Sequence, residues 1–333
     1  MARSRFLPDN FTLALVATVA LASLWPAHGP AARLFDGLTT FAIGLLFFLH
    51  GARLSREAVL AGVTHWRLHL LVFACTFVLF PLLGWGLKPL LSPLVTPQLY
   101  TGVMYLCVLP ATVQSAIAFT SLARGNVPAA VCSASASTLL GVFVTPVLVN
   151  LLVVPHHAAG SGGALDAIGR ILLQLMAPFI AGHLLRPWIG RFVHRHAKGL
   201  KFVDQGSILL VVYTAFSAAV IEGLWRQVPL AALAGLVVAC CVLLALVLAC
   251  TTWLARRLGF GKEDEITIVF CGSKKSLASG VPMAKVLFPV HAVGATVLPL
   301  MLFHQIQLMV CAVLAQRYAR RAATDAAALR VEH

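Results

Sequence analysis

Residues 266–288 read ITIVFCGSKKSLASGVPMAKVLF, an apolar stretch long enough to cross a membrane that carries two adjacent lysines near its middle. A lysine at the centre of a membrane helix costs about 2.5–3.5 kcal/mol on insertion scales, so the pair must face water, protein or an anionic partner. Small residues recur every four positions beside the lysines and allow close helix packing. We expect Ser273, Lys274, Lys275 and Ser276 to form a polar break in a spanning helix. This break either binds an anion or caps the carbonyl groups of the broken helix.

The composition indicates that most of this chain is surrounded by lipid. Of its 333 residues, 60% are hydrophobic and only 11% are charged, and the mean hydropathy is +0.91. An ordinary soluble domain is about 25% charged, and a soluble core of this length could not bury so much apolar surface. These values exclude a soluble enzyme, a nucleic-acid-binding module and a disordered chain. The eight cysteines form no CxxC pair and lie in apolar runs, as expected for small packing residues.

Ten apolar stretches are candidates for helices that cross a membrane. Their length and their lack of two-residue alternation argue against strands. We therefore predict an all-α integral membrane protein with ten transmembrane helices. The predicted spans are 11–25, 34–50, 68–87, 99–123, 127–154, 167–187, 202–221, 229–255, 266–288 and 292–316.

The distribution of basic residues predicts the orientation of the spans. If both termini are cytoplasmic, the external loops carry only Arg33, Lys88, Arg170 and Arg226 of the 25 lysines and arginines. This pattern follows the positive-inside rule and accounts for the net charge of +14 without a nucleic-acid partner. We expect a multi-pass protein of the plasma membrane, which in a bacterium is the inner membrane. The alternative, a signal peptide at 11–25, would leave nine spans and break the charge pattern.

The chain divides into two halves of five predicted spans each. Residues 1–154 form the first half and residues 166–320 the second, with a Gly- and His-rich linker at 155–165 and a tail at 321–333. An odd number of spans gives homologous halves opposite orientations, which is the inverted-repeat plan of secondary transporters. LPATVQSA at 109–116 interrupts the fourth span, the counterpart of the ninth span with its lysines. Paired interruptions of this kind point to a binding site.

Other polar residues within the spans extend the candidate site. Pro110 removes a backbone donor and kinks the fourth span, so its polar neighbours either coordinate an ion or substrate or repair the kink. The small polar residues of the fifth span either join the site or allow close helix packing. A histidine and an amide of the tenth span could also contribute. These candidates are Thr112, Gln114, Ser115, Thr120, Ser133, Ser137, Thr138, His304 and Gln305.

Four motifs carry a resemblance to a known family: SLARGN at 121–126, STLLGVFVTPVL at 137–148, FCGSKKSLASGVPMAKVLF at 270–288 and LPLMLFHQIQ at 298–307. Over about residues 10–320 the chain resembles the bile acid:sodium symporter family. Within it, the chain is similar to the SBF-like branch, which includes the seventh, orphan vertebrate member of solute carrier family ten. The resemblance implies two inverted repeats, a core domain of spans 3–5 and 8–10, and a panel domain of spans 1, 2, 6 and 7. It also implies that broken helices four and nine cross in the core, with substrate in the crevice beside the panel.

The resemblance implies sodium binding as well, but the residues of this chain argue against it. Aligned on helix nine, Cys271 stands where the family has an acid, and Lys275 stands near its glutamine. A fixed ammonium group in a low-dielectric site repels sodium strongly, so the lysine either replaces the cation or titrates and couples protons. Any sodium would lie near Ser115, Thr120 and Cys271. The coupling ion is left open between sodium and the proton.

The sequence contains no catalytic constellation, so we expect neither an enzyme nor a cofactor. The first hypothesis is a secondary active transporter, a symporter, that moves a small organic anion by alternating access. The alternative is a membrane regulator or scaffold that does not transport, for example in cellular calcium handling. Membrane lipid and the anion are the only partners expected, and the oligomeric state is not predicted.

Overall fold

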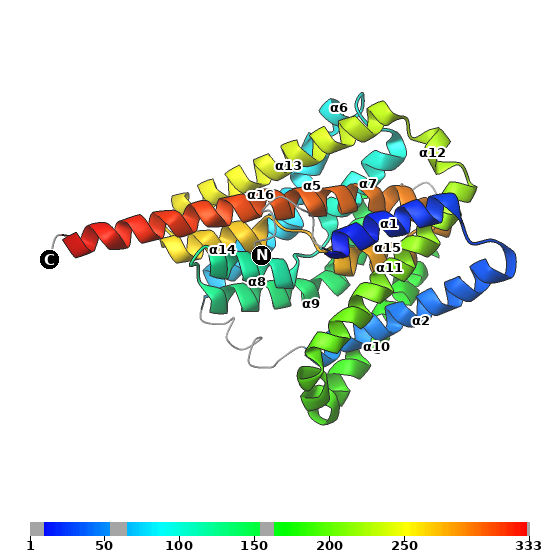
Figure 1. Ribbon diagram of the computed structural model, residues 1–333, viewed down its shortest axis with the longest axis horizontal. Coiled ribbons are helices and arrows are strands. Elements are labelled where there is room, and N and C mark those ends of the chain that lie inside the picture. The colour runs from blue at the N-terminus through cyan, green and yellow to red at the C-terminus, as the bar shows by residue number, and fades with distance from the viewer. Residues whose placement is uncertain (1–9, 54–64, 154–162, 332–333) are drawn as a thin grey trace.

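The computed structural model describes residues 10–53, 65–153 and 163–331. Over these residues every regular element is a helix and no strand is formed, which confirms the all-α class (Figure 1). Six of the described helices are long and apolar enough to cross a membrane, and the bent pair α7 and α8 makes a seventh if it is counted as one span. The count of ten spans and the inverted relation of the halves remain predictions.

Each predicted span coincides with a helix or with a helix interrupted by a break. The elements of the first half are α1 (Asn10–Leu24), α2 (Gly29–Arg53), α4 (Trp66–Ala74), the π-helix η2 (Cys75–Leu79), α5 (Phe80–Gly86), α6 (Lys88–Leu91), α7 (Pro97–Val108), α8 (Val113–Leu122) and α9 (Val127–Leu152). Those of the second half are α10 (Gly163–Arg195), α11 (Ala197–Ile221), α12 (Leu224–Gln227), α13 (Leu230–Arg257), α14 (Lys262–Gly272), α15 (Leu277–Leu287) and α16 (Val290–Val331). Because α10 begins at Gly163, most of the predicted linker at 155–165 lies outside the described residues.

The helices pack in two groups (Figure 1). In the first, called the α2 group, α2 packs against α10 and α11, and α11 packs against α1. The approach of α2 to α10 requires glycine, because a Cβ on Gly51 would overlap the carbonyl of Phe179 and one on Gly182 would overlap that of Phe48. The second, called the α16 group, contains α7 to α9 and α13 to α16, and α11 contacts α15 and α16 along the boundary.

One turn of π-helix shapes the span Trp66–Gly86, which is built from α4, η2 and α5. In the π register the N–H of Phe80 donates to the carbonyl of Cys75. The next donor in that register would be Pro81, which has no N–H. The carbonyl of Thr76 is therefore left without a backbone donor and needs a partner from elsewhere in the protein.

Candidate functional site

Two helix breaks touch each other within the α16 group. The first lies at 109–112, where the chain bends by 64° between α7 and α8. The second lies at 273–276, between α14 and α15. The backbone N–H of Ser276 donates to the carbonyl of Pro110 over 3.0 Å. Both predicted interruptions are thus present, and a direct hydrogen bond joins them.

The first break follows from Pro110, which cannot donate a hydrogen bond to the preceding turn and so ends α7. The last carbonyls of a helix lack partners within that helix and must find other donors. One comes from α9, where Thr145 Oγ1 donates to the carbonyl of Val108 over 2.9 Å. This helix approaches closely at Gly141, where a Cβ would lie 2.5 Å from the Pro110 ring. The small-residue face of the fifth predicted span therefore serves close packing at the break.

Three further carbonyls converge on the ammonium group of Lys275. Its Nζ donates to Thr76 over 2.8 Å, to Cys107 over 2.8 Å and to Leu109 over 2.7 Å. The side chain is fully buried, and Nζ lies 4.1 Å from the centre of the Phe80 ring. An ammonium group has three donors and no acceptor, whereas a carbonyl oxygen only accepts. The site is therefore complementary to a charged lysine.

The amide of Gln307 on α16 holds the backbone of the second break. Its Oε1 accepts from the N–H of Lys275 over 3.0 Å, and its Nε2 donates to the carbonyl of the same residue over 3.0 Å. The Nε2 atom also lies 2.9 Å from Nδ1 of His304. The sequence analysis left Gln307 out of the candidate site. Its position three residues after His304, on the same helix face, was the signal that could have included it.

Lys274 has a different environment from its neighbour. It is also fully buried, but its Nζ lies over the ring of Phe119, 4.2 Å from the ring centre. Its other electrostatic neighbours are the thiols of Cys271 and Cys311. Within the part of the chain that the structure describes, no oxygen accepts a hydrogen bond from this ammonium group. Only Lys275 reaches the carbonyls at the joined breaks.

A cavity of about 510 Å³ lies between the α16 group and the α2 group, beside the joined breaks. The first turns of α8 and α15 line it on one side, together with residues of α9 and α16. Residues of α1, α2, α10 and α11 form the other side. The predicted site residues that line the cavity are Thr112, Gln114, Ser115, Thr138, Ser276 and His304.

The side of the cavity formed by the α2 group contains charged residues that the sequence analysis did not assign to the site. His50 and Arg53 come from α2, and Lys201 and Asp204 come from α11. Arg53 forms an ion pair with Asp204. An acid inside the predicted span 202–221 is costly in a membrane, and this was the signal that could have identified Asp204.

The other predicted residues do not line the cavity. Ser137 supports the first break, because its Oγ accepts from the N–H of Ala111 over 3.0 Å. Ser133 pairs with Nδ1 of His69 over 2.7 Å and so joins α9 to α4. The residues of this set are Thr120, Ser133, Ser137, Ser273, Lys274, Lys275 and Gln305.

The atoms considered for sodium are distributed over two helices. The thiol of Cys271 on α14 donates to the carbonyl of Ala130 over 3.9 Å. The hydroxyls of Ser115 and Thr120 on α8 have no hydrogen-bond partner among the described residues. No hydrogen bond there links the three side chains, and no group of three or more His, Cys, Asp or Glu in the described segments could hold a metal ion. A sodium ion at this position stays a prediction.

Comparison with known proteins places this geometry in a family. The model of the SBF-like CPA transporter family matches residues 9–320. An uncharacterized protein of Pseudomonas aeruginosa is 73% identical over 330 residues, which cover 99% of this chain and 98% of that protein. The protein of Escherichia coli named "Putative symporter YfeH" is 61% identical over 317 residues, or 94% of this chain and 93% of that protein. Sodium/bile acid cotransporter 7 of Rattus norvegicus is 26% identical over 310 residues, or 91% of this chain and 90% of that protein.

Proposed function

Because the chain belongs to the SBF-like CPA transporter family, we propose that it is a secondary active transporter that moves a small organic anion by alternating access. The observation that carries this proposal is the cavity between the two helix groups, which lies beside two broken helices. Its volume of about 510 Å³ is suited to a small ligand, since such sites usually measure about 300–1,000 Å³.

The electrostatics of the cavity favour an anion. The first turns of α8 and α15 line the cavity, and the positive ends of their helix dipoles favour a negative charge there. Arg53, Lys201 and His50 add basic groups on the opposite side. Among the described residues that line the cavity, Asp204 is the one acid, and its charge is offset by Arg53. A carboxylate or a similar small anion would therefore be bound from both sides.

Lys275 would take the place that a bound cation has in a sodium-coupled transporter. Its ammonium group holds together three carbonyls of helices that would otherwise need an ion at the breaks. A second positive charge at this position would be repelled strongly in a low dielectric. We infer that transport does not require sodium at the joined breaks, and that the proton is the coupling ion to test first.

Alternating access would consist of a movement of the α2 group relative to the α16 group. The cavity is suited to this role because its two sides come from the two groups, so that their movement would change its exposure. The proposal requires no cofactor. We place the protein in the bacterial inner membrane with both termini in the cytoplasm, as the basic loops predict.

Uptake by purified protein in proteoliposomes tests this function. We expect at least one small carboxylate from a labelled set to accumulate, to respond to a pH gradient and to be unaffected by replacement of sodium with choline. Lys201→Gln should raise KM several-fold because it removes a charge that lines the cavity, whereas Lys88→Gln, outside the cavity, should not.

Ligands that stabilise the protein but never cross the bilayer would contradict transport and favour a regulator. Uptake that depends on sodium would contradict the role given to Lys275. A change in KM that is equal for Lys201→Gln and Lys88→Gln would contradict the location of the site.

A further inference from the structure

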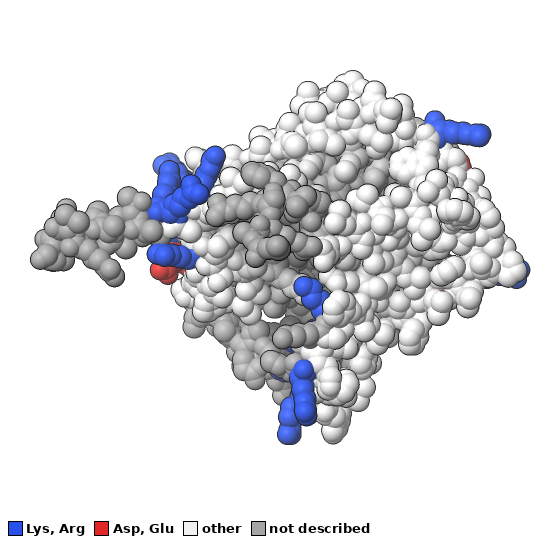
Figure 2. All heavy atoms as spheres, in the orientation of Figure 1, with Lys and Arg blue, Asp and Glu red and all other residues white. Residues whose placement is uncertain are grey.

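A second groove, which shares no lining residue with the cavity, lies between α13 and α16 at the end of α13. Its volume is about 960 Å³, and its apolar wall includes Leu248 of α13 and Val310 and Val313 of α16. At the other end the lining changes to Arg256, Arg257 and Arg317. Figure 2 shows lysine and arginine side chains gathered at the end of the molecule from which α16 extends, while most of this face is uncharged.

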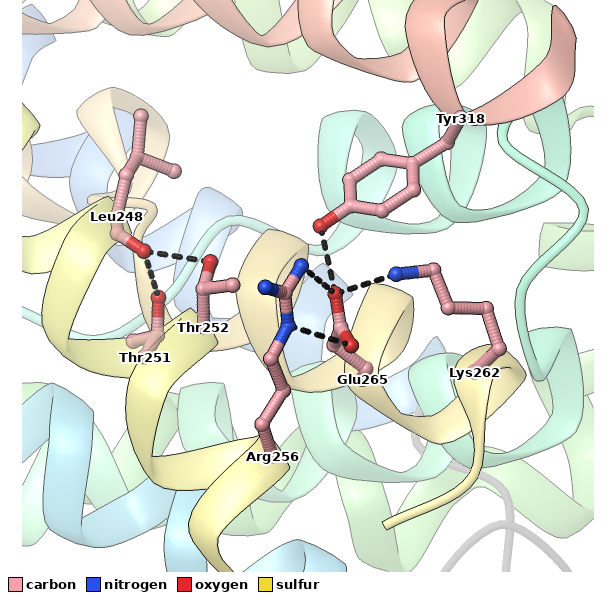
Figure 3. Close-up of polar contacts among 7 residues, drawn as sticks. All are labelled: Leu248, Thr251, Thr252, Arg256, Lys262, Glu265 and Tyr318. Atoms are coloured by element: carbon pink, nitrogen blue, oxygen red, sulfur yellow. Dashed lines mark hydrogen bonds and ion pairs between the residues drawn. The ribbon is translucent and has the colours of Figure 1, made fainter. Parts of the chain in front are cut away.

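The acid that pairs with Arg256 also accepts hydrogen bonds from two other side chains (Figure 3). Glu265 is only 5% exposed and accepts two hydrogen bonds from Arg256, one from Lys262 and one from the hydroxyl of Tyr318. Burial raises the pKa of Glu265, but the hydrogen bonds from Arg256, Lys262 and Tyr318 outweigh it and hold the pKa below its ordinary value. The carboxylate is thus charged and balances only one of the two cations that it contacts.

Two other arginines line the groove, Arg257 and Arg317. Within the described segments Arg257 and Arg317 form no ion pair with a carboxylate. Tyr318, the residue after Arg317, reaches Glu265, which in turn holds Arg256. Through Glu265, the end of α13 and the turn of α16 around Tyr318 are therefore held beside each other. The result is a cluster of positive charge at one end of an apolar groove.

We propose that this groove binds an anionic phospholipid, with the phosphate group on Arg257 and Arg317 and an acyl chain along the apolar wall. The ten residues from Leu248 to Arg257 extend over about 14 Å of helix, enough for a substantial part of an acyl chain. Trp253 also lines the groove and is 62% exposed, as is typical of tryptophan at the boundary between acyl chains and headgroups. Basic pockets between membrane helices are known to bind anionic headgroups.

The proposal predicts a ligand with both a phosphodiester charge and an acyl chain. A soluble phosphate would leave the apolar wall uncovered, and a zwitterionic lipid would bring a positive group to a positive cluster. Each of these two ligands lacks one of the two features that the groove is proposed to recognise, so both serve as controls in a binding experiment.

Thermal unfolding of delipidated protein in a neutral detergent measures the binding. We expect phosphatidylglycerol to raise the Tm in a saturable manner, and phosphatidylcholine and glycerol phosphate to have little effect. The double variant Arg257→Gln/Arg317→Gln should bind phosphatidylglycerol about twenty-five-fold more weakly, at about a factor of five for each arginine near a lipid phosphate. Arg257→Lys/Arg317→Lys, which keeps both charges, should retain most of the affinity.

Arg33→Gln/Arg226→Gln is the matched control, because it removes two exposed arginines that do not line the groove. This control variant should show the same rise in Tm with phosphatidylglycerol as the native protein. An equal response of the Arg257→Gln/Arg317→Gln variant and the native protein would overturn the site. Equal stabilisation by phosphatidylcholine, or by glycerol phosphate, would overturn the proposed ligand.

Discussion

The break between α7 and α8 and the break between α14 and α15 contribute opposite chemical groups to one contact. The first contains a proline and no ionisable side chain, and it presents the carbonyls of Cys107, Leu109 and Pro110. The second contains two lysines, and it presents an ammonium group and a backbone N–H. The first break thus supplies hydrogen-bond acceptors and the second supplies the donors. Neither could be stable alone in a membrane, where unsatisfied polar groups cost several kcal/mol.

The strongest test of this complementarity removes the cation. Lys275→Ala leaves three buried carbonyl oxygens without their shared donor, at about 1–3 kcal/mol each, so a loss of at least about 3 kcal/mol is expected. The same three oxygens are ligands of the kind that small hard cations prefer. Thermal unfolding of the variant should therefore become sensitive to sodium, with a higher Tm in sodium chloride than in choline chloride at equal ionic strength.

The control for this experiment is Lys274→Ala, which leaves those carbonyls and their donor in place. Its Tm should not distinguish sodium from choline. Sodium-dependent stabilisation of the native protein, or none in Lys275→Ala, would show that the lysine is not a substitute for a cation.

A smaller effect is expected when the support of the second break is removed. Gln307→Leu leaves the N–H and the carbonyl of Lys275 without their partners, at a cost of about 2 kcal/mol. Gln307→Glu keeps the acceptor and should lose only part of this stability. Thermal unfolding of the two variants beside the native protein measures the difference. If both variants matched the native protein, the break would be held by other contacts.

The two breaks should also differ in their response to acid, because only the second follows a helix anchored by an ionic cluster. The folded-state pKa of Glu265 lies below its ordinary value of 4.5. Its contribution is therefore complete above about pH 4.5 and is lost as the pH falls through the lower folded-state value. Because Arg256 and Lys262 are largely exposed, the contribution should be about 1 kcal/mol.

Unfolding measured from pH 7 to pH 3 in the native protein and in Glu265→Gln isolates the contribution of the Glu265 carboxylate to stability. The difference in stability between the two proteins should be constant at neutral pH and shrink in acid. A difference that grows as the pH falls would contradict the assigned direction.

Hydropathy, prolines and the lysines within an apolar span were sufficient to predict the helical class and both breaks. Each of these features acts locally, since an apolar run makes a span and Pro110 ends a helix wherever it occurs. One of the three partners of Lys275 could not be predicted in the same way. This partner is the carbonyl of Thr76, which accepts from Lys275 because a π-turn precedes Pro81 in a helix far away in the sequence.

The charges of the α2 group were missed for a related reason. Arg53 lies just beyond the predicted span 34–50 and Asp204 near the start of the span 202–221, and the sequence analysis predicted no role for either residue. Their role at the cavity depends on how α2 and α11 pack against each other. A pattern within one span does not contain this information, although the acid inside an apolar run indicated a functional residue.

The smallest effect on stability is expected for a substitution of Lys274, whereas substitution of its neighbour Lys275 should have the largest effect. Lys274→Met replaces a buried ammonium group that no described oxygen accepts with an apolar side chain of similar length. The loss of the contact with the Phe119 ring should be offset by relief of the desolvation cost of a buried charge. We therefore expect a change in stability below about 1 kcal/mol and of either sign, against a large loss for Lys275→Met. A loss for Lys274→Met as large as that for Lys275→Met would mean that both lysines hold the breaks, and the two positions would no longer differ in role.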